Sequence, residues 1–249
     1  MFLPVQATTR TVKGGGARSE SEKRFVAFRE SVSRRLNAMD PASAIEVLKI
    51  ADRALHQTEY VSRWYNDAAW HFAVSSSDPL KGRMITDAIR VFRPRNCLEL
   101  GTAYGLGTTY IAVAQRKYVP GGKTWTIESS DEQFAFSSRM LDEVFGAMVL
   151  PIAGLTSLAI PEVISHGFDF VFHDAGHSLD DYVQDFACML PGLNAGAVVV
   201  FDDIRWDGYT QTGSPARCYE GWLKVVEHPR VEAAFEVNGE YGVALIGRP

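Results

Sequence analysis

From residue 79 onward, short apolar runs alternate with segments of helical periodicity. We expect strands at 96–100, 124–127, 148–152, 168–172 and 197–201, and helices at 79–92, 106–116, 131–145, 157–165, 179–190 and 216–227. This alternation is typical of βαβ units, whose parallel strands are covered by helices on both faces. Asn238-Gly239 separates two further strand-like runs, 231–237 and 241–246, and predicts an antiparallel hairpin. The sequence therefore predicts an α/β fold with a mostly parallel sheet of seven strands.

The segment before residue 78 is expected to add helices to this domain. Residues 1–19 contain Gly14-Gly15-Gly16 and no apolar period, and we expect a flexible tail. Residues 20–77 are expected to form a helical appendage, which we interpret as a lid over the pocket of the acceptor substrate. One helix should begin at Asp40-Pro41 and continue to Leu55, and another should cover 59–72.

Composition and charge exclude several classes of protein. With 46% hydrophobic residues the chain is globular rather than disordered, and no apolar run is long enough for a membrane helix. The three cysteines, Cys97, Cys188 and Cys218, form no Cys-x-x-Cys pair, which argues against a zinc cage and favours a reducing, cytoplasmic compartment. The net charge of −5 divides into +4 over the first forty residues and −9 over the rest. A solvated helical face explains the basic part better than a nucleic-acid site does.

A glycine-rich turn and an acidic residue predict a nucleoside site. Gly101, Gly105 and Gly107 follow the strand that contains Glu99, at a sheet edge where α/β folds bind ligands. Their spacing differs from the Gly-x-Gly-x-x-Gly fingerprint, and the turn has no basic residue for a pyrophosphate. Glu128 ends the next strand and could accept both hydroxyls of a ribose. Together these features favour an adenosine ligand without phosphate, with NAD as the second choice; a tight turn and a surface glutamate are the structural alternative.

Acidic residues at the ends of two later strands predict a cation site. Asp174, Asp202 and Asp203 would repel one another at one edge unless a cation intervened, and carboxylate oxygens suit Mg²⁺ or Mn²⁺. Helix capping is the alternative role for these acids. His177 lies three residues after Asp174 and is a candidate general base, or else a loop histidine. His173 should point to the opposite face and pack in the core.

The segments Lys81-Gly82-Arg83-Met84 through Gly107, then Glu128, Asp174 and Asp202-Asp203, resemble the metal-dependent, class I S-adenosylmethionine O-methyltransferases. Catechol and caffeoyl-CoA O-methyltransferases are familiar members, and the resemblance covers residues 78–249. It implies a Rossmann-like methyltransferase sheet and a magnesium (or manganese) ion bound by Asp174, Asp202 and Asp203. The residues implied for binding S-adenosylmethionine are Glu99, Gly101, Thr102, Gly105, Gly107, Glu128, Ser129, Thr156 and Asp174. Aromatic walls of the acceptor pocket would come from Trp64, Tyr65, Trp70 and Trp206.

Two departures from the catechol enzymes bear on the acceptor. Those enzymes have Asp-Asn where this chain has Asp202-Asp203, and they use a lysine base that has no counterpart here at the matching place. The Asp174-x-x-His177 spacing is closer to macrocin-type sugar O-methyltransferases, in which a histidine is the base. We therefore expect His177 and Asp174 to be catalytic, and the acceptor to be a hydroxyl of a small molecule, either a phenol or a sugar-like alcohol.

Three other functions remain open at this stage. A NAD-dependent oxidoreductase lacks support because the dinucleotide fingerprint and a Tyr-x-x-x-Lys pair are missing. An RNA methyltransferase of the same fold could bind through the basic first forty residues, although the acidic remainder argues against nucleic acid as a partner. A scaffold that binds the cofactor without chemistry would not need His177 and its neighbouring acids. The only assembly that we expect is a homodimer, and no membrane partner is expected.

Overall fold

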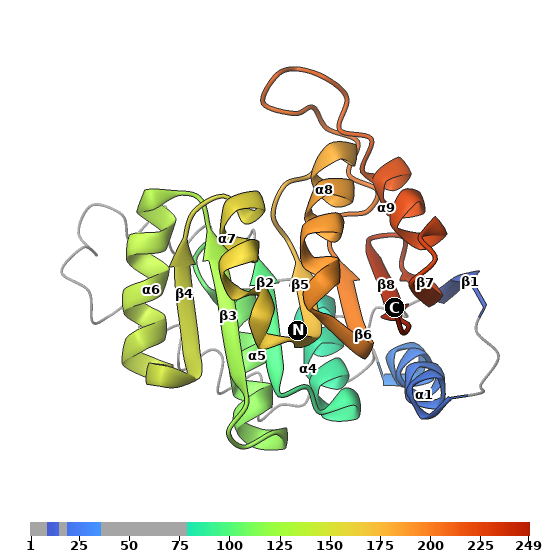
Figure 1. Cartoon of the computed structure of the whole chain (residues 1–249), viewed down its shortest axis with the longest axis horizontal. Helices are drawn as coiled ribbons and strands as arrows, with labels where there is room; N and C mark the ends of the chain where they lie inside the picture. The colour runs from blue at the N-terminus through green and yellow to red at the C-terminus, as the bar shows by residue number, and fades with distance from the viewer. Residues whose placement is uncertain (1–8, 15–18, 36–78) are drawn as a thin grey trace.

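One eight-stranded sheet organises the computed structural model, which describes residues 9–14, 19–35 and 79–249 (Figure 1). The strands lie in the order β1-β7-β8-β6-β5-β2-β3-β4. Their bounds are β1 Thr9–Lys13, β2 Asn96–Leu100, β3 Lys123–Glu128, β4 Val149–Ala153, β5 Phe168–His173, β6 Leu193–Phe201, β7 Val231–Val237 and β8 Tyr241–Ile246.

The strand order reverses beside β2. The chain runs outward from β2 through β3 to β4, then returns to place β5 on the other side of β2, followed by β6. These five strands pair in parallel, whereas β8, β7 and β1 add antiparallel pairs at the other edge. In open α/β sheets, ligands bind outside the carboxyl ends of the strands at such a reversal. The topology therefore predicts a ligand site at the ends of β2 and β5.

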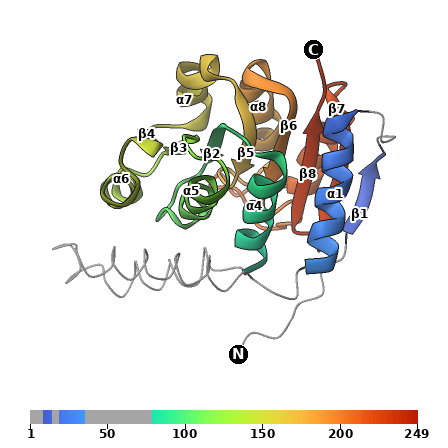
Figure 2. The same cartoon turned by 90° about the horizontal axis from the view of Figure 1, so that it is seen from below.

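Helices cover both faces of the sheet. They are α1 Glu20–Arg35, α4 Pro79–Phe92, α5 Leu106–Tyr118, α6 Asp131–Phe145, α7 Thr156–Val163, α8 Leu179–Met189 and α9 Cys218–Glu227. Figure 2 shows α1, α4 and α5 on one side of the sheet and α7 and α8 on the other. Short 3₁₀ turns follow α6, α7 and α8 at Gly146–Met148, Ile164–His166 and Leu190–Gly192. Among the described helices, none combines the length and the apolar character that a membrane crossing requires.

The core has two main parts, one on each face of the sheet. Phe170 and Phe172 of β5 pack with the helices of the first face, whereas Val171 between them packs with those of the second. All three side chains are fully buried. Because both faces are covered, β5 is an almost continuous apolar run rather than an alternating one. This burial holds β2 and β5 rigidly, and with them the residues that follow each strand.

The expected α/β fold, its parallel strands and its C-terminal hairpin are confirmed, but the expected number of strands is wrong. Thr9–Lys13 lies within the predicted tail of residues 1–19, yet it forms β1 and pairs antiparallel with β7. The Nζ of Lys13 donates to the carbonyl oxygens of Val226 and His228, at 3.1 and 3.2 Å. Strand β1 thus covers an edge of β7 that would otherwise present unpaired backbone groups.

Parts of the predicted N-terminal appendage cannot be compared with the structure. Helix α1 agrees with the expectation of helix after residue 20. A hydrogen-bond network attaches α1 to α4, because Asp87 accepts from Ser31 at 3.2 Å and from Arg90 at 3.1 Å. The helices predicted from Asp40 to Leu55 and over 59–72, with Trp64, Tyr65 and Trp70, lie outside the described residues.

Candidate functional site

The ends of β2, β5 and β6 are held together by backbone hydrogen bonds. The N–H of Asp174 donates to the carbonyl of Leu100 at 2.8 Å, and the N–H of Asp202 donates to the carbonyl of His173 at 2.9 Å. Gly101 continues β2 with φ of 89°, and a Cβ at this position would lie closer than 3.0 Å to the Asp174 carbonyl oxygen. Only glycine permits both the turn and this close approach.

Glu128 ties the end of β3 to the glycine-rich turn. Its Oε2 accepts a hydrogen bond of 2.7 Å from the N–H of Ala103, and its Oε1 accepts one of 2.8 Å from the N–H of Ser130. Ala103 adopts a positive φ of 46°, which is uncommon for a residue with a side chain. Each carboxylate oxygen keeps a further lone pair, so the group can still accept hydrogen bonds from a ligand. The Glu128 carboxylate therefore keeps acceptor capacity beyond its two backbone contacts.

Glu99 lies beneath the turn rather than on its open side. The side chain is buried, and Thr108 and Thr126 both donate hydroxyl hydrogen bonds to its Oε2, the latter at 2.6 Å. Thr102, also buried, has its hydroxyl 2.5 Å from that of Thr126. Burial raises the pKa of Glu99 to about 8, although the two threonine hydroxyls oppose the shift. Glu99 and Thr102 thus stabilise the glycine-rich turn from its buried side.

Gly105 and Gly107 have no side chains, and this lets α5 lie close to Glu99 and α6. Gly105 precedes α5 with φ of 87°, and a Cβ there would lie closer than 3.0 Å to the Met140 side chain. A Cβ on Gly107 would come equally close to Oε1 of Glu99, which has no hydrogen-bond partner among the described residues. The spacing of these glycines therefore follows from the packing of α5 against Glu99 and α6.

A lysine lies between two of the predicted site acids. The Nζ of Lys81, in α4, donates to Oδ2 of Asp174 at 3.0 Å and forms a closer ion pair with Oδ2 of Asp202. Lys81 and Asp202 are buried. Burial acts to lower the pKa of Lys81, but the two carboxylates outweigh it and raise the pKa, so Lys81 remains an ammonium. Burial and the Asp174 carboxylate raise the pKa of Asp202, and Lys81 counteracts this effect.

Close helix packing brings Lys81 to the site. The next residue, Gly82, faces the ring of Tyr110 in α5, and a Cβ there would lie closer than 3.0 Å to several ring atoms. Because Gly82 has no side chain, α4 can lie directly against α5, with Met84 and Ile85 buried in the core behind it. Lys81 is thereby placed over the ends of β5 and β6.

His177 lies on the other side of Asp174. Its Nε2 is 3.3 Å from Oδ2 of Asp203 and 3.8 Å from Oδ1 of Asp174. Burial acts to lower the pKa of His177, but these two carboxylates raise it above its ordinary value. The contact with His177 in turn lowers the pKa of Asp203. The ring of His177 also packs edge-on against Trp206, with centroids 5.8 Å apart.

The three acids predicted to bind a metal do not converge on one point. Asp174 and Asp202 share Lys81, whereas Asp203 has a positive φ of 52° and turns toward His177. Within the described ranges, no group of three His, Cys, Asp or Glu side chains is arranged to hold a metal ion. The arrangement as it stands does not fit a divalent ion, because the ammonium of Lys81 is already paired with Oδ2 of both Asp174 and Asp202.

The remaining predicted residues divide between two environments. Thr156, the first residue of α7, donates its hydroxyl to Oδ1 of Asp185 at 2.6 Å, and Oδ2 of the same carboxylate lies 3.0 Å from Nε2 of His173. His173 is buried against Tyr182, which confirms the expected packing role. Ser129 is exposed between β3 and α6. Thr156 is thus part of a hydrogen-bond network that joins β5, α7 and α8.

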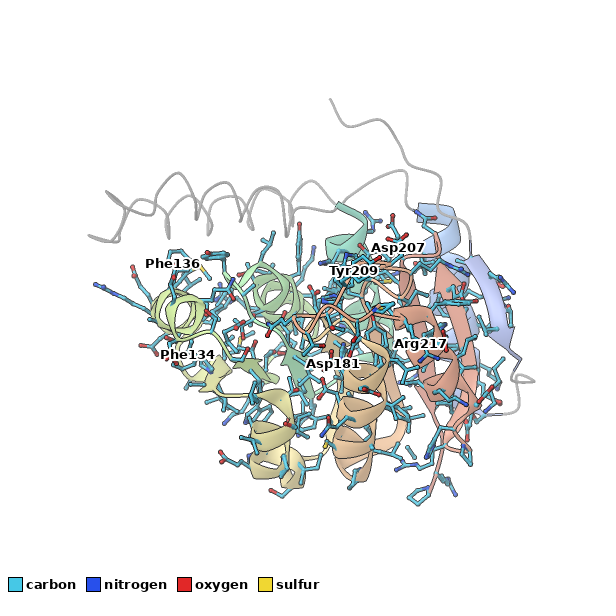
Figure 3. All side chains as sticks on the ribbon, turned by 90° about the horizontal axis from the view of Figure 1, so that it is seen from above. Phe134, Phe136, Asp181, Asp207, Tyr209 and Arg217 are labelled. Atoms are coloured by element: carbon cyan, nitrogen blue, oxygen red, sulfur yellow. The ribbon has the colours of Figure 1, made fainter. Side chains whose placement is uncertain are left out.

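An exposed aromatic segment follows Asp203. In Figure 1 the stretch between β6 and α9 projects beyond the ends of α8 and α9. Trp206 and Tyr209 are 42% and 69% exposed, which is unusual for large aromatic side chains. In Figure 3, which views the molecule from above, Asp207 and Tyr209 are labelled on this segment. The segment offers apolar surface close to His177.

Sequence reasoning missed two features of this site. Lys81 was included in the resemblance, but nothing in its spacing indicated that it pairs with Asp174 and Asp202. The N–H of Ala103 was also missed, because a positive φ at a residue other than glycine has no sequence signal. The adjacent pair Lys81-Gly82 contains the one useful hint, since a glycine within a helix often marks close packing.

Comparisons with known proteins found similarity to methyltransferases. A family profile described as "Methyltransferase domain" matches residues 98–204, from β2 to the segment after β6. A "Probable O-methyltransferase" of Mycobacterium tuberculosis is 30% identical over 164 residues, which cover 59% of this chain and 66% of that protein. A catechol O-methyltransferase of Niastella koreensis is 27% identical over 146 residues, covering 53% of this chain and 60% of that protein. The chain therefore spans less than two thirds of the length of these curated relatives.

The fold is also similar to solved structures of this kind. The O-methyltransferase from Bacillus cereus, solved in complex with SAH, superposes with a TM-score of 0.61 at 18% sequence identity. The superposition covers 91% of this chain and 99% of that one. The Rossmann-like methyltransferase fold that the resemblance implied is thus confirmed.

Proposed function

We propose that this chain is an S-adenosylmethionine-dependent O-methyltransferase that acts on a hydroxyl group of a small molecule. The observation that carries the proposal is the contact between Glu128 and the glycine-rich turn at the reversal of strand order. An acid at this position suits a ribose, and the turn 101–107 contains no basic residue that would pair with a phosphate. The similarity to O-methyltransferases, one of them solved with SAH, supports the same conclusion.

The residues present fit a nucleoside cofactor. Glu128 has lone pairs left on both carboxylate oxygens, and Gly101 lets the turn pass directly against the backbone of Asp174. We also assign Ser129, exposed beside Glu128, and Asp174, beyond Gly101, to this site. Thr156 would act indirectly, since its hydroxyl is bonded to Asp185.

S-adenosylmethionine supplies a methyl group on a sulfonium that is already activated for transfer. The protein must therefore align the acceptor and remove its proton, and we assign that proton to His177. Nε2 of His177 lies 3.3 Å from Oδ2 of Asp203 without a hydrogen bond between them, so the ring is placed beside a carboxylate that can pair with it once it is protonated. The carboxylates of Asp203 and Asp174 would stabilise the imidazolium that forms.

The acceptor class follows from the surroundings of His177. Trp206 packs against the imidazole and remains 42% exposed, so it offers a flat apolar surface next to the base. A phenol would pack on this surface, and a sugar ring could stack its apolar face there as well. We assign no step to Mg²⁺ or Mn²⁺, because Asp174 and Asp202 are paired with Lys81.

A cytoplasmic location and a homodimer remain predictions that accompany this function. The cysteines Cys97, Cys188 and Cys218 are all free thiols, which suits a reducing compartment. Some of the basic residues near the N-terminus have internal partners: Lys13 contacts the end of α9, and Arg24 pairs with Glu20. These contacts favour a small-molecule acceptor over RNA.

Ligand binding and turnover test the proposal. S-adenosylhomocysteine should raise the melting temperature, since ligand at 100 times its Kd contributes about 2.7 kcal/mol of stability, whereas NADH should not. Stabilisation by NADH alone would instead indicate an oxidoreductase. A screen of catechols, other phenols and sugar alcohols with labelled S-adenosylmethionine then identifies the acceptor. Methyl incorporation only into RNA, weakening steeply with salt, would contradict the small-molecule assignment.

A further inference from the structure

The carboxylate cluster at the ends of β5 and β6 already contains a cation. Lys81 contributes an ammonium whose Nζ contacts both Asp174 and Asp202. The side chain of Asp202 is 3% exposed and that of Lys81 is 10% exposed, so neither charge is substantially solvated. Buried charges of opposite sign require such pairing, because each alone would carry a large desolvation cost.

We propose that Lys81 is the resident cation of this cluster and takes the place of a divalent metal ion. Lys81 pairs with the Oδ2 atoms of Asp174 and Asp202, and Oδ1 of Asp202 already accepts a hydrogen bond from the N–H of Asp203 at 2.9 Å. A dication beside the ammonium would also be repelled, since two like charges a few ångströms apart destabilise each other strongly at a buried site. Lys81 therefore acts as a positioning residue that holds the two carboxylates together.

The surrounding fold keeps Lys81 in this place. Gly82 packs against Tyr110, so α4 lies tightly on α5 at the position next to Lys81. Asp202 is held from the other side, because the hydroxyl of Tyr182 donates to its backbone carbonyl. The acid that is left over, Asp203, pairs with His177 and is 52% exposed at its side chain. Lys81 thus comes from helix α4, whereas Asp174 and Asp202 are the first residues after the buried strands β5 and β6.

The two carboxylate oxygens of Asp174 face different partners. Lys81 contacts Oδ2 of Asp174, while His177 lies nearer to Oδ1 of the same carboxylate. Asp174 is therefore placed between a permanent cation and the proposed base. Under the proposed methyl transfer, on which this role depends, Lys81 would fix the orientation of Asp174 toward His177 without a metal.

Binding of Mn²⁺ to the full chain tests the assignment. Titrations followed by electron paramagnetic resonance and calorimetry should detect no Mn²⁺ site in the unaltered protein that depends on Asp202. Lys81→Met should gain one Mn²⁺ site per chain, with a Kd at least about tenfold lower than that of any residual Mn²⁺ binding to the unaltered protein, because the repelling charge is gone. Lys224→Met, which removes an exposed lysine paired with Glu227, serves as the matched control and should gain none.

Two outcomes would overturn the proposal. One is a single Mn²⁺ site in the unaltered chain that Asp202→Asn abolishes; this measurement needs no lysine variant and remains decisive if Lys81→Met does not fold. The other is a folded Lys81→Met protein that binds Mn²⁺ no better than the control. Binding of S-adenosylhomocysteine is measured in parallel. Failure to bind it would contradict the proposed methyltransferase function, whereas the Mn²⁺ titrations test only the role of Lys81.

Discussion

The carboxylate of Glu128 and the backbone N–H of Ala103 meet at 2.7 Å across 25 positions of sequence. This contact joins the end of β3 to the turn after β2, and it requires Ala103 to adopt a positive φ. One acidic side chain thus holds the glycine-rich turn, and it is the side chain that we propose to bind a ribose.

Replacing this acid should weaken cofactor binding. Glu128→Gln removes the charge and one of the two acceptors, and hydrogen bonds to charged groups contribute about 1.5–3 kcal/mol each. We expect the Kd of S-adenosylhomocysteine to rise about 10- to 100-fold, as measured by calorimetry. The exposed Glu132→Gln, in the first turn of α6, is the control. An unchanged Kd for Glu128→Gln would remove Glu128 from the binding site.

His177 should affect the rate more than binding. Once an acceptor is identified, His177→Gln should lower kcat by about 10²–10⁴, the usual contribution of a general base. The Kd of S-adenosylhomocysteine should stay within about twofold, because no cofactor contact is assigned to this side chain. His166→Gln replaces an exposed histidine that stacks on Trp125 and should leave kcat unchanged. Equal losses in rate and affinity would demote His177 to a structural role.

Alanine substitutions at two glycines of similar φ distinguish the cost of backbone strain from the cost of a steric clash. Gly121→Ala places a side chain at φ of 84° in open space and should cost about 1–2 kcal/mol, the penalty of the left-handed region. Gly101→Ala has a comparable φ of 89° but also meets the Asp174 carbonyl, so its cost should exceed about 4 kcal/mol. Urea denaturation measures both. Equal free energies of unfolding would show that the contact between β2 and β5 relaxes easily.

Glu99 should make stability depend on pH. Its folded pKa of about 8 lies above the ordinary value of 4.5, so the folded state favours the neutral acid. The stability gained from that form is complete below about pH 4.5 and is lost as pH rises through 8. Glu99→Gln cannot ionise, so its melting temperature should rise relative to the unaltered protein between pH 5 and 8, by about 2–4 °C per kcal/mol.

The control for this experiment is an exposed glutamate on a helix, away from strand β2, which contains Glu99. Glu162→Gln, in α7, should follow the pH profile of the unaltered chain. If Glu99→Gln also follows that profile, Glu99 does not change its protonation state within the window. Comparing the two variants at each pH cancels the contributions of all other titrating groups.

The predicted fold and most of the predicted site came from local patterns. Apolar runs such as 168–172 are recognisable because strands buried on both faces are continuously apolar. Asp174 and Asp202 could be assigned to one edge, since parallel strands end on the same side of the sheet. By contrast, the pairing of Thr9–Lys13 with β7 depends on an open edge more than 200 residues away in the sequence.

By itself, then, the sequence determined the parallel sheet, the glycine-rich turn and the acids at its carboxyl edge. Periodicity and backbone freedom are local properties that the residue order encodes directly. Only the tertiary structure decided which charge those acids meet: the packing of Gly82 on Tyr110 places the ammonium of Lys81 between Asp174 and Asp202. Helix-to-helix distance is set by side-chain volume at the contact, and that distance decides whether a lysine reaches the carboxylates.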